Sequence, residues 1–353
     1  MKVLIYATGQ DTGGQGFRIA DAFARHAPDW DVQSRAAGRS VLGYPEQKWL
    51  PITDRKADIL ALYRDADVVH LRNNLAGWQM ADRGTGKPTI IHHHGSQFRS
   101  NHGRIAREAR HIGAVQLAAT IDLTLLEPDV QWMPSPYEVD DLAAMRRPHG
   151  DGRVRIAYFP TSPRIKSMGP FMAAYRRLVL THKVELLTNI SGNRVRHMPN
   201  ADVLALKAQA DILFDQVILG YGNNAIEAMG MGIPVIAGVQ DENVRSAMLE
   251  RWGSLPWYDA TEQTIYDALV RMVESADLRA EYAALGMAHV RRWHDAPVVV
   301  GMLSEVYRTA PPTRTNVDQF RPTTARAWAE RRSSLRDRQL AIRAEREKRR
   351  AVA

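Results

Sequence analysis

One stretch of the chain combines residue types that can bind a phosphate and a sugar hydroxyl. It runs from an apolar strand ending at Phe214, through the turn Gly220-Tyr221-Gly222, into a helix expected to open near Asn223. Such a turn leaves backbone N–H groups unpaired at the positive end of a helix, which is a place for a phosphate. Glu227, about one helical turn further on, can accept hydrogen bonds from sugar or ribose hydroxyls, because an ionised carboxylate only accepts. Phosphate and polyol together predict a sugar nucleotide.

Two cations follow a strand expected at residues 154–159. They are Arg164 and Lys166, which are separated by one residue on a loop just before a helix. This placement suits a diphosphate whose negative charge grows as a sugar–phosphate bond breaks. The alternative is a pair of solvated loop cations. We expect both side chains, and Lys166 above all, to face a diphosphate.

A glycine-rich loop follows the first strand, which is expected at residues 2–7. Its sequence is Thr12-Gly13-Gly14-Gln15-Gly16, and a helix is expected directly after it. The glycines permit close approach of the backbone to an anion or a sugar. The spacing departs from the three-glycine dinucleotide fingerprint and the acidic residue of that motif is missing, so NAD is not expected. A tight strand-to-helix turn is the alternative.

Three successive histidines close a strand expected at residues 89–93. Side chains alternate across a strand, so His92 and His94 share one face and His93 lies on the other. These histidines have no acidic residues nearby in the sequence that would complete a metal site. A histidine packed in the core is the usual alternative. The pair Asp65 and Asp67 stands between a helix end and a strand, where capping and turn roles are favoured. We therefore expect no required metal.

The stretch from residue 210 to residue 236 resembles the donor-binding segment of glycosyltransferases with two facing Rossmann-like domains, the GT-B fold. The match lies in the series Asp215-Gln216, Gly220-Tyr221-Gly222 and Glu227-Ala228-Met229. It is similar to the retaining, family 4-like group, also called glycosyltransferases group 1. Many members of that group carry a glutamate eight residues before the one that matches Glu227, where this chain has Leu219. The resemblance covers most of residues 1–310 and is densest between residues 154 and 240.

The resemblance implies a role for each candidate residue. It implies an enzyme that moves a hexose or pentose from a nucleotide-diphosphate sugar to an acceptor hydroxyl, with retention of configuration and without a metal or another cofactor. His94 would lie near the transferred sugar, with Arg164 and Lys166 on the diphosphate, and these three would be the catalytic residues. Arg99 would contact the acceptor or a phosphate. The implied donor site consists of Gly13, Gly14, Asn189, Gly220, Tyr221, Gly222, Asn223, Asn224 and Glu227.

Length and composition fit a two-domain α/β enzyme. The chain has 353 residues, 45% of them hydrophobic, and no cysteine, which excludes disulfides and thiol nucleophiles. Strand-like and helix-like segments alternate in two successive sets, which indicates two parallel sheets covered by helices. We expect a Rossmann-like acceptor domain at residues 1–148, a Rossmann-like donor domain at 149–296, a helix crossing back at 297–310, and ligands in the cleft between the domains. No apolar run reaches the roughly 20 residues that span a bilayer, and a cytoplasmic location is expected.

The positive charge of the chain is concentrated at its end. Residues 311–353 carry 12 Lys/Arg and 5 Asp/Glu, a net of +7 within a total of +8. This basic, helix-like extension has few large apolar residues, so we favour a solvated helix over an arm that contacts protein or nucleic acid.

The residues leave the acceptor and part of the function open. A glycan, a lipid-linked sugar, a protein hydroxyl and a modified DNA base are all candidate acceptors. A sugar-nucleotide epimerase or phosphorylase on the same fold is one alternative to a transferase, because a fold does not fix a reaction. A non-catalytic nucleic-acid-binding or assembly protein that acts through the Arg-rich tail is the other.

Overall fold

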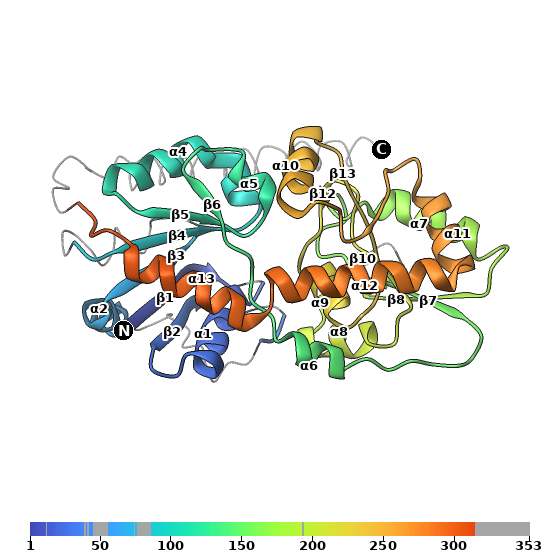
Figure 1. Ribbon diagram of the computed structural model, residues 1–353, viewed down its shortest axis with the longest axis horizontal. Coiled ribbons are helices and arrows are strands. Elements are labelled where there is room, and N and C mark those ends of the chain that lie inside the picture. Colours follow the sequence, from blue (N-terminus) through green and yellow to red (C-terminus); the bar gives the residue numbers. More distant parts are fainter. Residues whose placement is uncertain are drawn as a thin grey trace, which may run out of the picture.

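The computed structural model describes residues 1–11, 13–38, 40, 42–44, 56–73, 75, 86–192 and 194–314. Within this part the chain forms two α/β domains (Figure 1). Residues 315–353, and with them most of the expected basic extension, lie outside the described residues. The described beginning of the extension contacts the first domain, where Thr313 Oγ1 donates to Lys87 O at 3.0 Å and Arg314 N to Ile112 O at 2.9 Å.

The first domain contains a six-stranded parallel sheet. Its elements are β1 (Lys2–Gln10), α1 (Gln15–His26), β2 (Asp31–Gly38), α2 (Lys56–Asp65), β3 (Val68–Arg72), β4 (Thr89–His93), α4 (Ser96–Ile112), β5 (Val115–Ala118), α5 (Ile121–Thr124) and β6 (Val130–Trp132). The strand order is β2-β1-β3-β4-β5-β6. Leu4 and Tyr6 of β1 pack with α2 and α4, whereas Val3 and Ile5 pack with α1 on the opposite face. Burial on both faces explains why the strands are almost continuously apolar.

The second domain contains a mostly parallel sheet of the same size. Its elements are β7 (Val154–Tyr158), α7 (Met168–Leu178), β8 (Val184–Thr188), β9 (Ile190–Ser191), β10 (Arg194–Val195), α8 (Asn200–Lys207), β11 (Ile212–Phe214), β12 (Leu219–Gly220), α9 (Asn223–Gly230), β13 (Val235–Val239), α10 (Glu242–Trp252), β14 (Tyr258–Asp259), α11 (Ile265–Glu274) and α12 (Ala276–Trp293). The order is β12-β13-β11-β7-β8, with β14 also on β13. Within this sheet the short β12 is antiparallel to β13, and β9 and β10 form a separate antiparallel pair. The two Rossmann-like domains expected from the sequence are confirmed.

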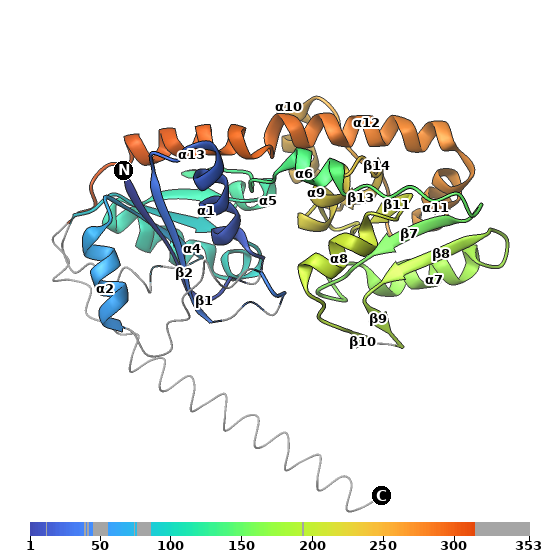
Figure 2. The same cartoon turned by 90° about the horizontal axis from the view of Figure 1, so that it is seen from below.

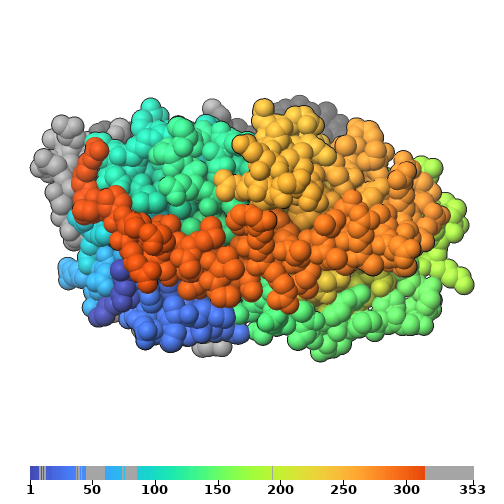
Figure 3. Space-filling model, viewed as in Figure 1, coloured from blue at the N-terminus to red at the C-terminus, as the bar shows by residue number. Residues whose placement is uncertain are grey.

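The chain passes between the domains at two adjacent points. Tyr137 N donates to His294 O and Ala296 N donates to Tyr137 O, both at 2.8 Å, so the two crossing segments pair side by side. After the second crossing, α13 (Ala296–Thr309) packs into the core of the first domain against α1. Figure 3 shows α12 and α13 as one band that runs across both domains.

The first crossing comes earlier than the boundary that we expected at residue 148. The short helix α6 (Val139–Ala144) already packs in the second domain, because its apolar residues Val139 and Leu142 join the core that contains Ala225 and Met229 of α9. The Pro- and Gly-containing segment at residues 146–152 is therefore a surface loop of the second domain. Viewed from below, α1 faces α8 and α9 across the boundary (Figure 2). None of the described helices is long and apolar enough to span a bilayer.

Candidate active site between the two domains

A cavity of about 720 Å³ lies where β1, β3 and β4 end and meet the second domain. The carboxyl ends of strands in open α/β sheets are where ligands bind. The second domain contributes Thr161, after β7, and Asn223, at the start of α9, and the first domain contributes the rest of the described wall. We call this space the His94 cavity. Its described lining residues are Ala7, Gly9, Gly13, Gln15, Arg72, Asn73, His94, Gly95, Ser96, Gln97, Ala119, Thr120, Thr161 and Asn223.

Lys166 lies against the glycine turn beside this cavity. Its ammonium contacts Oδ1 of Asp215, and Oδ2 of the same carboxylate accepts from Gly222 N at 2.8 Å. A Cβ added at Gly222 would lie 3.3 Å from Lys166 Nζ. Tyr158 holds this loop in place, because its hydroxyl donates to Lys166 O at 2.7 Å. The structure thus brings together Lys166 and the turn, and it adds Asp215 as a buried counter-charge.

The turn opens α9 with free backbone donors. Gly220 has a φ of 87°, in the left-handed region that favours glycine. Gly222 N is taken by Asp215, whereas the N–H groups of Asn223 and Asn224 have no acceptor among the residues that the structure describes. The Asn224 side chain is held in place, with Nδ2 donating to Phe159 O at 2.7 Å. The start of α9 can therefore donate two N–H groups to an anion.

We expected Tyr221 at the donor site, but its side chain faces elsewhere. Its ring lies in the core, 5.3 Å from the ring of Trp257 and 5.5 Å from that of Trp252, measured between centroids. Its hydroxyl lies 2.8 Å from His294 Nε2 and 3.2 Å from His289 Nε2. The inward direction buries a large ring and pairs its hydroxyl, so only the backbone of Tyr221 belongs to the turn.

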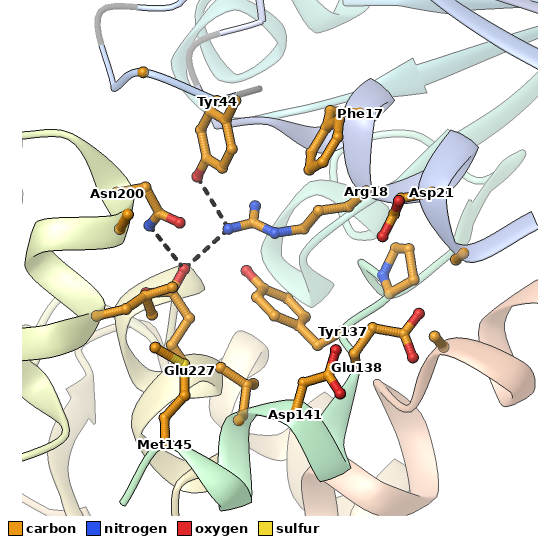
Figure 4. Close-up of a pocket in the computed structure, with 17 residues that line it drawn as sticks. Phe17, Arg18, Asp21, Tyr44, Tyr137, Glu138, Asp141, Met145, Asn200 and Glu227 are labelled. Atoms are coloured by element: carbon orange, nitrogen blue, oxygen red, sulfur yellow. Dashed lines mark hydrogen bonds and ion pairs between the residues drawn. The ribbon is translucent and has the colours of Figure 1, made fainter. Parts of the chain in front are cut away.

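Glu227 lines a second cavity of about 330 Å³, between α1, α6 and α8, rather than the opening that holds the glycine turn (Figure 4). We call this space the Glu227 cavity. Oε1 of Glu227 accepts from Arg18 Nη2 at 2.9 Å and from Asn200 Nδ2 at 3.4 Å, and Oε2 accepts from Lys207 Nζ at 2.5 Å. The carboxylate was expected to be open to ribose hydroxyls. It is instead 2% exposed and already paired on both oxygens.

The charges around Glu227 keep it ionised. Burial by itself would raise the pKa of Glu227, but Lys207 and Arg18 outweigh burial and hold that pKa below its ordinary value. Lys207 is fully buried and also donates to Asn224 Oδ1 at 3.1 Å. One lysine therefore fixes both the carboxylate and the first turn of α9.

The glycine loop of the first domain binds an internal anion in place of an external one. The carboxylate of Asp11 accepts from the N–H groups of Gln15 and Gly16, each at 2.9 Å, and of Phe17 at 3.2 Å. It also pairs with the buried guanidinium of Arg72. The N-terminus of α1, which we expected to approach a phosphate or a sugar, is already occupied by Asp11.

The two glycines of this loop differ in role. A Cβ at Gly14 would lie 2.6 Å from the Tyr44 ring, and Gly14 has a φ of 63°, so packing and backbone conformation both require glycine there. Gly13 lines the His94 cavity and faces the other domain, where a Cβ would lie 3.3 Å from Asn223 Nδ2. Gln15 Nε2 donates to Asn223 Oδ1 at 3.2 Å. The loop thus contacts the start of α9, while Gly14 serves the turn alone.

His94 lies at the end of β4 and lines the cavity that carries its name. Its backbone N donates to Asn73 Oδ1 at 2.7 Å, while neither ring nitrogen has a partner within the described residues. Burial, followed by the neighbouring His92 and Arg72, keeps the pKa of His94 well below its ordinary value. The imidazole is therefore neutral near pH 7. Among the described residues no group of His, Asp and Glu is arranged to hold a metal ion.

The remaining predicted residues lie at the edges of the site. Arg99, in the first turn of α4, donates from Nε to Asp122 Oδ2 at 2.6 Å. Asn189 pins two loops, with Nδ2 donating to Pro160 O at 3.1 Å and to Arg196 O at 2.8 Å. Arg164 is exposed, and its side chain has no hydrogen bond or ion pair to the described residues. Lys166 is therefore paired with Asp215, whereas Arg164 on the same loop is exposed and unpaired within the described residues.

Sequence reasoning missed five residues that hold the site together. They are Asp11, Arg18, Arg72, Lys207 and Asp215. Asp11 lies three residues before the N-cap Gly14, outside the position at which sequence rules expect a capping side chain. Asp215 stood inside the matched series without a role. Arg18 and Lys207 lie inside the helices α1 and α8, where a charged residue normally faces solvent, so nothing local marked them.

Comparison with known proteins supports the fold. No protein-family model and no curated protein matches this chain. The chain is similar to the structure of Anabaena Alr3699/HepE in complex with UDP and glucose, with a TM-score of 0.62 and 13% identity, covering 88% of this chain and 100% of that one. It is similar to an alpha-glucosyltransferase in complex with UDP and a 13-mer DNA, with a TM-score of 0.62 and 9% identity at 88% and 100% coverage. WaaG, a glycosyltransferase involved in lipopolysaccharide biosynthesis, gives a TM-score of 0.53 and 14% identity, also at 88% and 100% coverage. The chain has the two-domain GT-B fold of these glycosyltransferases.

Proposed function

We propose that the protein is a glycosyltransferase that moves a sugar from a nucleotide-diphosphate sugar to an acceptor hydroxyl. The observation that carries the proposal is the contact of Lys166 with the glycine turn that opens α9, where Asn223, the first residue of the helix, lines the same cavity as His94. A lysine and a helix N-terminus together suit a diphosphate. The volume of about 720 Å³ suits a ligand of this size. The similarity to structures that contain UDP or UDP-glucose supports the same class of donor.

In the proposed reaction the acceptor oxygen bonds to the anomeric carbon of the donor sugar, while the bond from that carbon to the diphosphate oxygen breaks. The electron pair of the broken bond stays with the diphosphate, which also takes the proton of the acceptor hydroxyl. Lys166 and the N–H groups of Asn223 and Asn224 stabilise the charge that develops. Exposed Arg164, on the same loop as Lys166, supplies a second cation. These groups provide the charge stabilisation, so the proposal requires no metal.

Two further residues orient the donor in this proposal. The neutral imidazole of His94, with both ring nitrogens unpaired among the described residues, hydrogen-bonds to a hydroxyl of the transferred sugar. Glu227, held on α9 by Lys207 and Arg18, keeps the start of that helix, and with it the N–H donors, in place. We infer retention of configuration from the resemblance to the retaining group, and the described lining of the His94 cavity contains no carboxylate that could act as a nucleophile.

Calorimetric titration with UDP, GDP and ADP tests the proposal. We expect one nucleotide to bind the wild-type chain and to lose at least tenfold in affinity in Lys166→Ala. Lys166→Arg keeps a cation beside Asp215 and should retain more affinity, which separates loss of charge from unfolding. Lys183→Ala changes an exposed lysine at the opposite end of the sheet, before β8, and should bind as the wild type does. Absence of binding by every nucleotide would contradict the proposal.

A product assay separates a transferase from the enzymatic alternative. With the matching nucleotide sugar, a transferase releases the nucleotide diphosphate and joins the sugar to an acceptor. An epimerase returns a nucleotide sugar with one inverted stereocentre, which NMR of the product would identify.

A further inference from the structure

We propose that the acceptor taken by the His94 cavity is an uncharged, hydroxyl-rich sugar residue. This inference rests on the proposed transfer reaction and specifies its acceptor class. The wall built by the first domain carries it, because the second domain contributes only Thr161 and Asn223 to the described lining. Three properties of that wall select a neutral sugar: its charge balance, its unpaired polar atoms and its lack of large rings.

The cations at this wall are already neutralised. Arg72, which lines the cavity and is 6% exposed, pairs with Asp11, which is 1% exposed. Arg99, beside Gly95, pairs with Asp122, which is 8% exposed. The described lining contains no lysine and no carboxylate. A negatively charged acceptor would find no uncompensated cation here, and a positively charged one would find no free carboxylate.

Several polar atoms at the wall are buried without a partner. They are Gln15 Oε1, both ring nitrogens of His94, Thr120 Oγ1, and Nε and Nη1 of Arg72, whose charge is paired with Asp11 but which makes no hydrogen bond from these atoms, considered within the described part of the chain. Gln15 is 6% exposed, so its side-chain oxygen is shielded from bulk solvent. Buried polar atoms without partners are rare and costly in folded proteins. Sugar hydroxyls both donate and accept, so an acceptor sugar can satisfy the amide oxygen, the threonine hydroxyl and the one imidazole nitrogen of His94 that the transferred sugar leaves free.

The same wall offers nothing to a base or a lipid chain. No phenylalanine, tyrosine or tryptophan occurs in the described lining, and Ala7 and Ala119 are its only apolar side chains. Enzymes that act on an extruded base normally hold it between aromatic or apolar side chains. An acyl chain needs continuous apolar surface. Both kinds of ligand would leave the unpaired polar atoms unsatisfied.

Saturation-transfer NMR on the full chain, with the nucleotide selected by calorimetry present, tests the inference. The neutral probes are the methyl α-glycosides of glucose, mannose and galactose, and octyl glucoside distinguishes a lipid-linked sugar from a free glycan. Methyl glucuronide, a serine-containing peptide and a 13-mer DNA with a hydroxymethylated base represent the other classes. We expect at least one neutral glycoside to bind. Equal binding of methyl and octyl glycosides indicates a glycan, and stronger binding of the octyl form indicates a lipid-linked sugar.

Thr120→Val provides the decisive variant. It removes an unpaired buried hydroxyl, so the melting temperature should stay the same or rise, while glycoside affinity falls about 3- to 10-fold and nucleotide affinity does not change. Thr124→Val, at the end of the helix α5 that Thr120 precedes, is the control, since Thr124 Oγ1 donates to Ile121 O at 2.7 Å and Thr124 does not line the cavity. It should lower the melting temperature and leave glycoside affinity unchanged.

The outcomes separate this inference from the proposed function. If a nucleotide binds but only the glucuronide, the peptide or the DNA gives a signal, or no probe does, the acceptor inference is overturned and the transferase proposal stands. Unchanged glycoside affinity in Thr120→Val would also overturn it. If no nucleotide binds, the proposed function fails first.

Discussion

Arg18 and Glu227 form an ion pair across the domain boundary. Arg18 Nη2 on α1 lies 2.9 Å from Glu227 Oε1 on α9, and the two side chains are 10% and 3% exposed. The guanidinium also lies over the rings of Tyr137 and Tyr44, 4.5 Å and 5.1 Å from their centroids. Because each partner belongs to a different domain, the pair links the relative position of the domains to the helix whose start we propose for the diphosphate.

Arg18→Met should destabilise the chain by about 3 kcal/mol, because removing one partner of a buried pair leaves the other charge uncompensated. Urea unfolding of Arg18→Met, Glu227→Gln and the double variant measures this. We expect a coupling free energy of about 1 to 3 kcal/mol between the two sites. Strictly additive effects of the two substitutions would show that the pair contributes nothing of its own.

Lys207→Met should weaken nucleotide binding about tenfold, equivalent to about 1.4 kcal/mol, although Lys207 lines neither cavity. The reason is that Lys207 holds Glu227 Oε2 and Asn224 Oδ1 together. Calorimetric titration of the variant checks this, with Lys183→Met as the exposed control. Binding equal to the wild type would show that the start of α9 is positioned without Lys207.

Asp11→Asn should lower the stability by about 2 kcal/mol, because a charged cap that accepts three N–H groups becomes a neutral one. It should also leave the charge of Arg72 uncompensated at the wall of the His94 cavity. We therefore expect inorganic phosphate to raise the melting temperature of Asp11→Asn more than that of the wild type. Asp31→Asn, at an exposed position in β2, is the control. An equal phosphate response in all three proteins would contradict the assigned role of Asp11.

Buried histidines should make the fold sensitive to mild acid. Burial lowers the pKa of His70 to about 3, and it lowers the pKa values of His93 and His294 to about 4 each. The unfolded chain titrates near pH 6.5, so it binds protons below that pH that the folded chain does not. The contribution of these neutral histidines to the free energy of unfolding should be present in full above about pH 6.5. It should fall as the pH drops towards about 4, by about 1.4 kcal/mol per pH unit for each such histidine.

Urea unfolding as a function of pH checks this expectation. His93→Gln removes one of the buried groups and should make the loss of stability below about pH 6 shallower by about 1.4 kcal/mol per pH unit. His197→Gln changes an exposed histidine and should leave the slope as it is. A slope that His93→Gln does not change would mean that His93 is protonated in the folded chain as well.

The architecture and the meeting of Lys166 with the glycine turn were open to prediction from the sequence. Alternating apolar strands and helices specify parallel sheets because each pattern has its own period. Strands of a parallel sheet end at the same edge, so the loop after β7 and the turn before α9 had to lie near each other. A glycine at position 220 predicted that turn from the sequence alone. The structure shows Gly220 with a left-handed φ.

Only the tertiary structure decided which way the side chains of those elements point and which distant residues they meet. Arg18 and Glu227 are 209 positions apart, and no local pattern announces their pairing. Tyr221 turned into the core because a pocket of tryptophan and histidine rings, supplied by α10, α12 and the second crossing, pairs its hydroxyl. The N-terminus of α1 is not free for a ligand, because the carboxylate of Asp11 already accepts from its N–H groups. The sequence thus determined the elements and the chemistry that they offer, and long-range packing determined which of those groups remain free for a ligand.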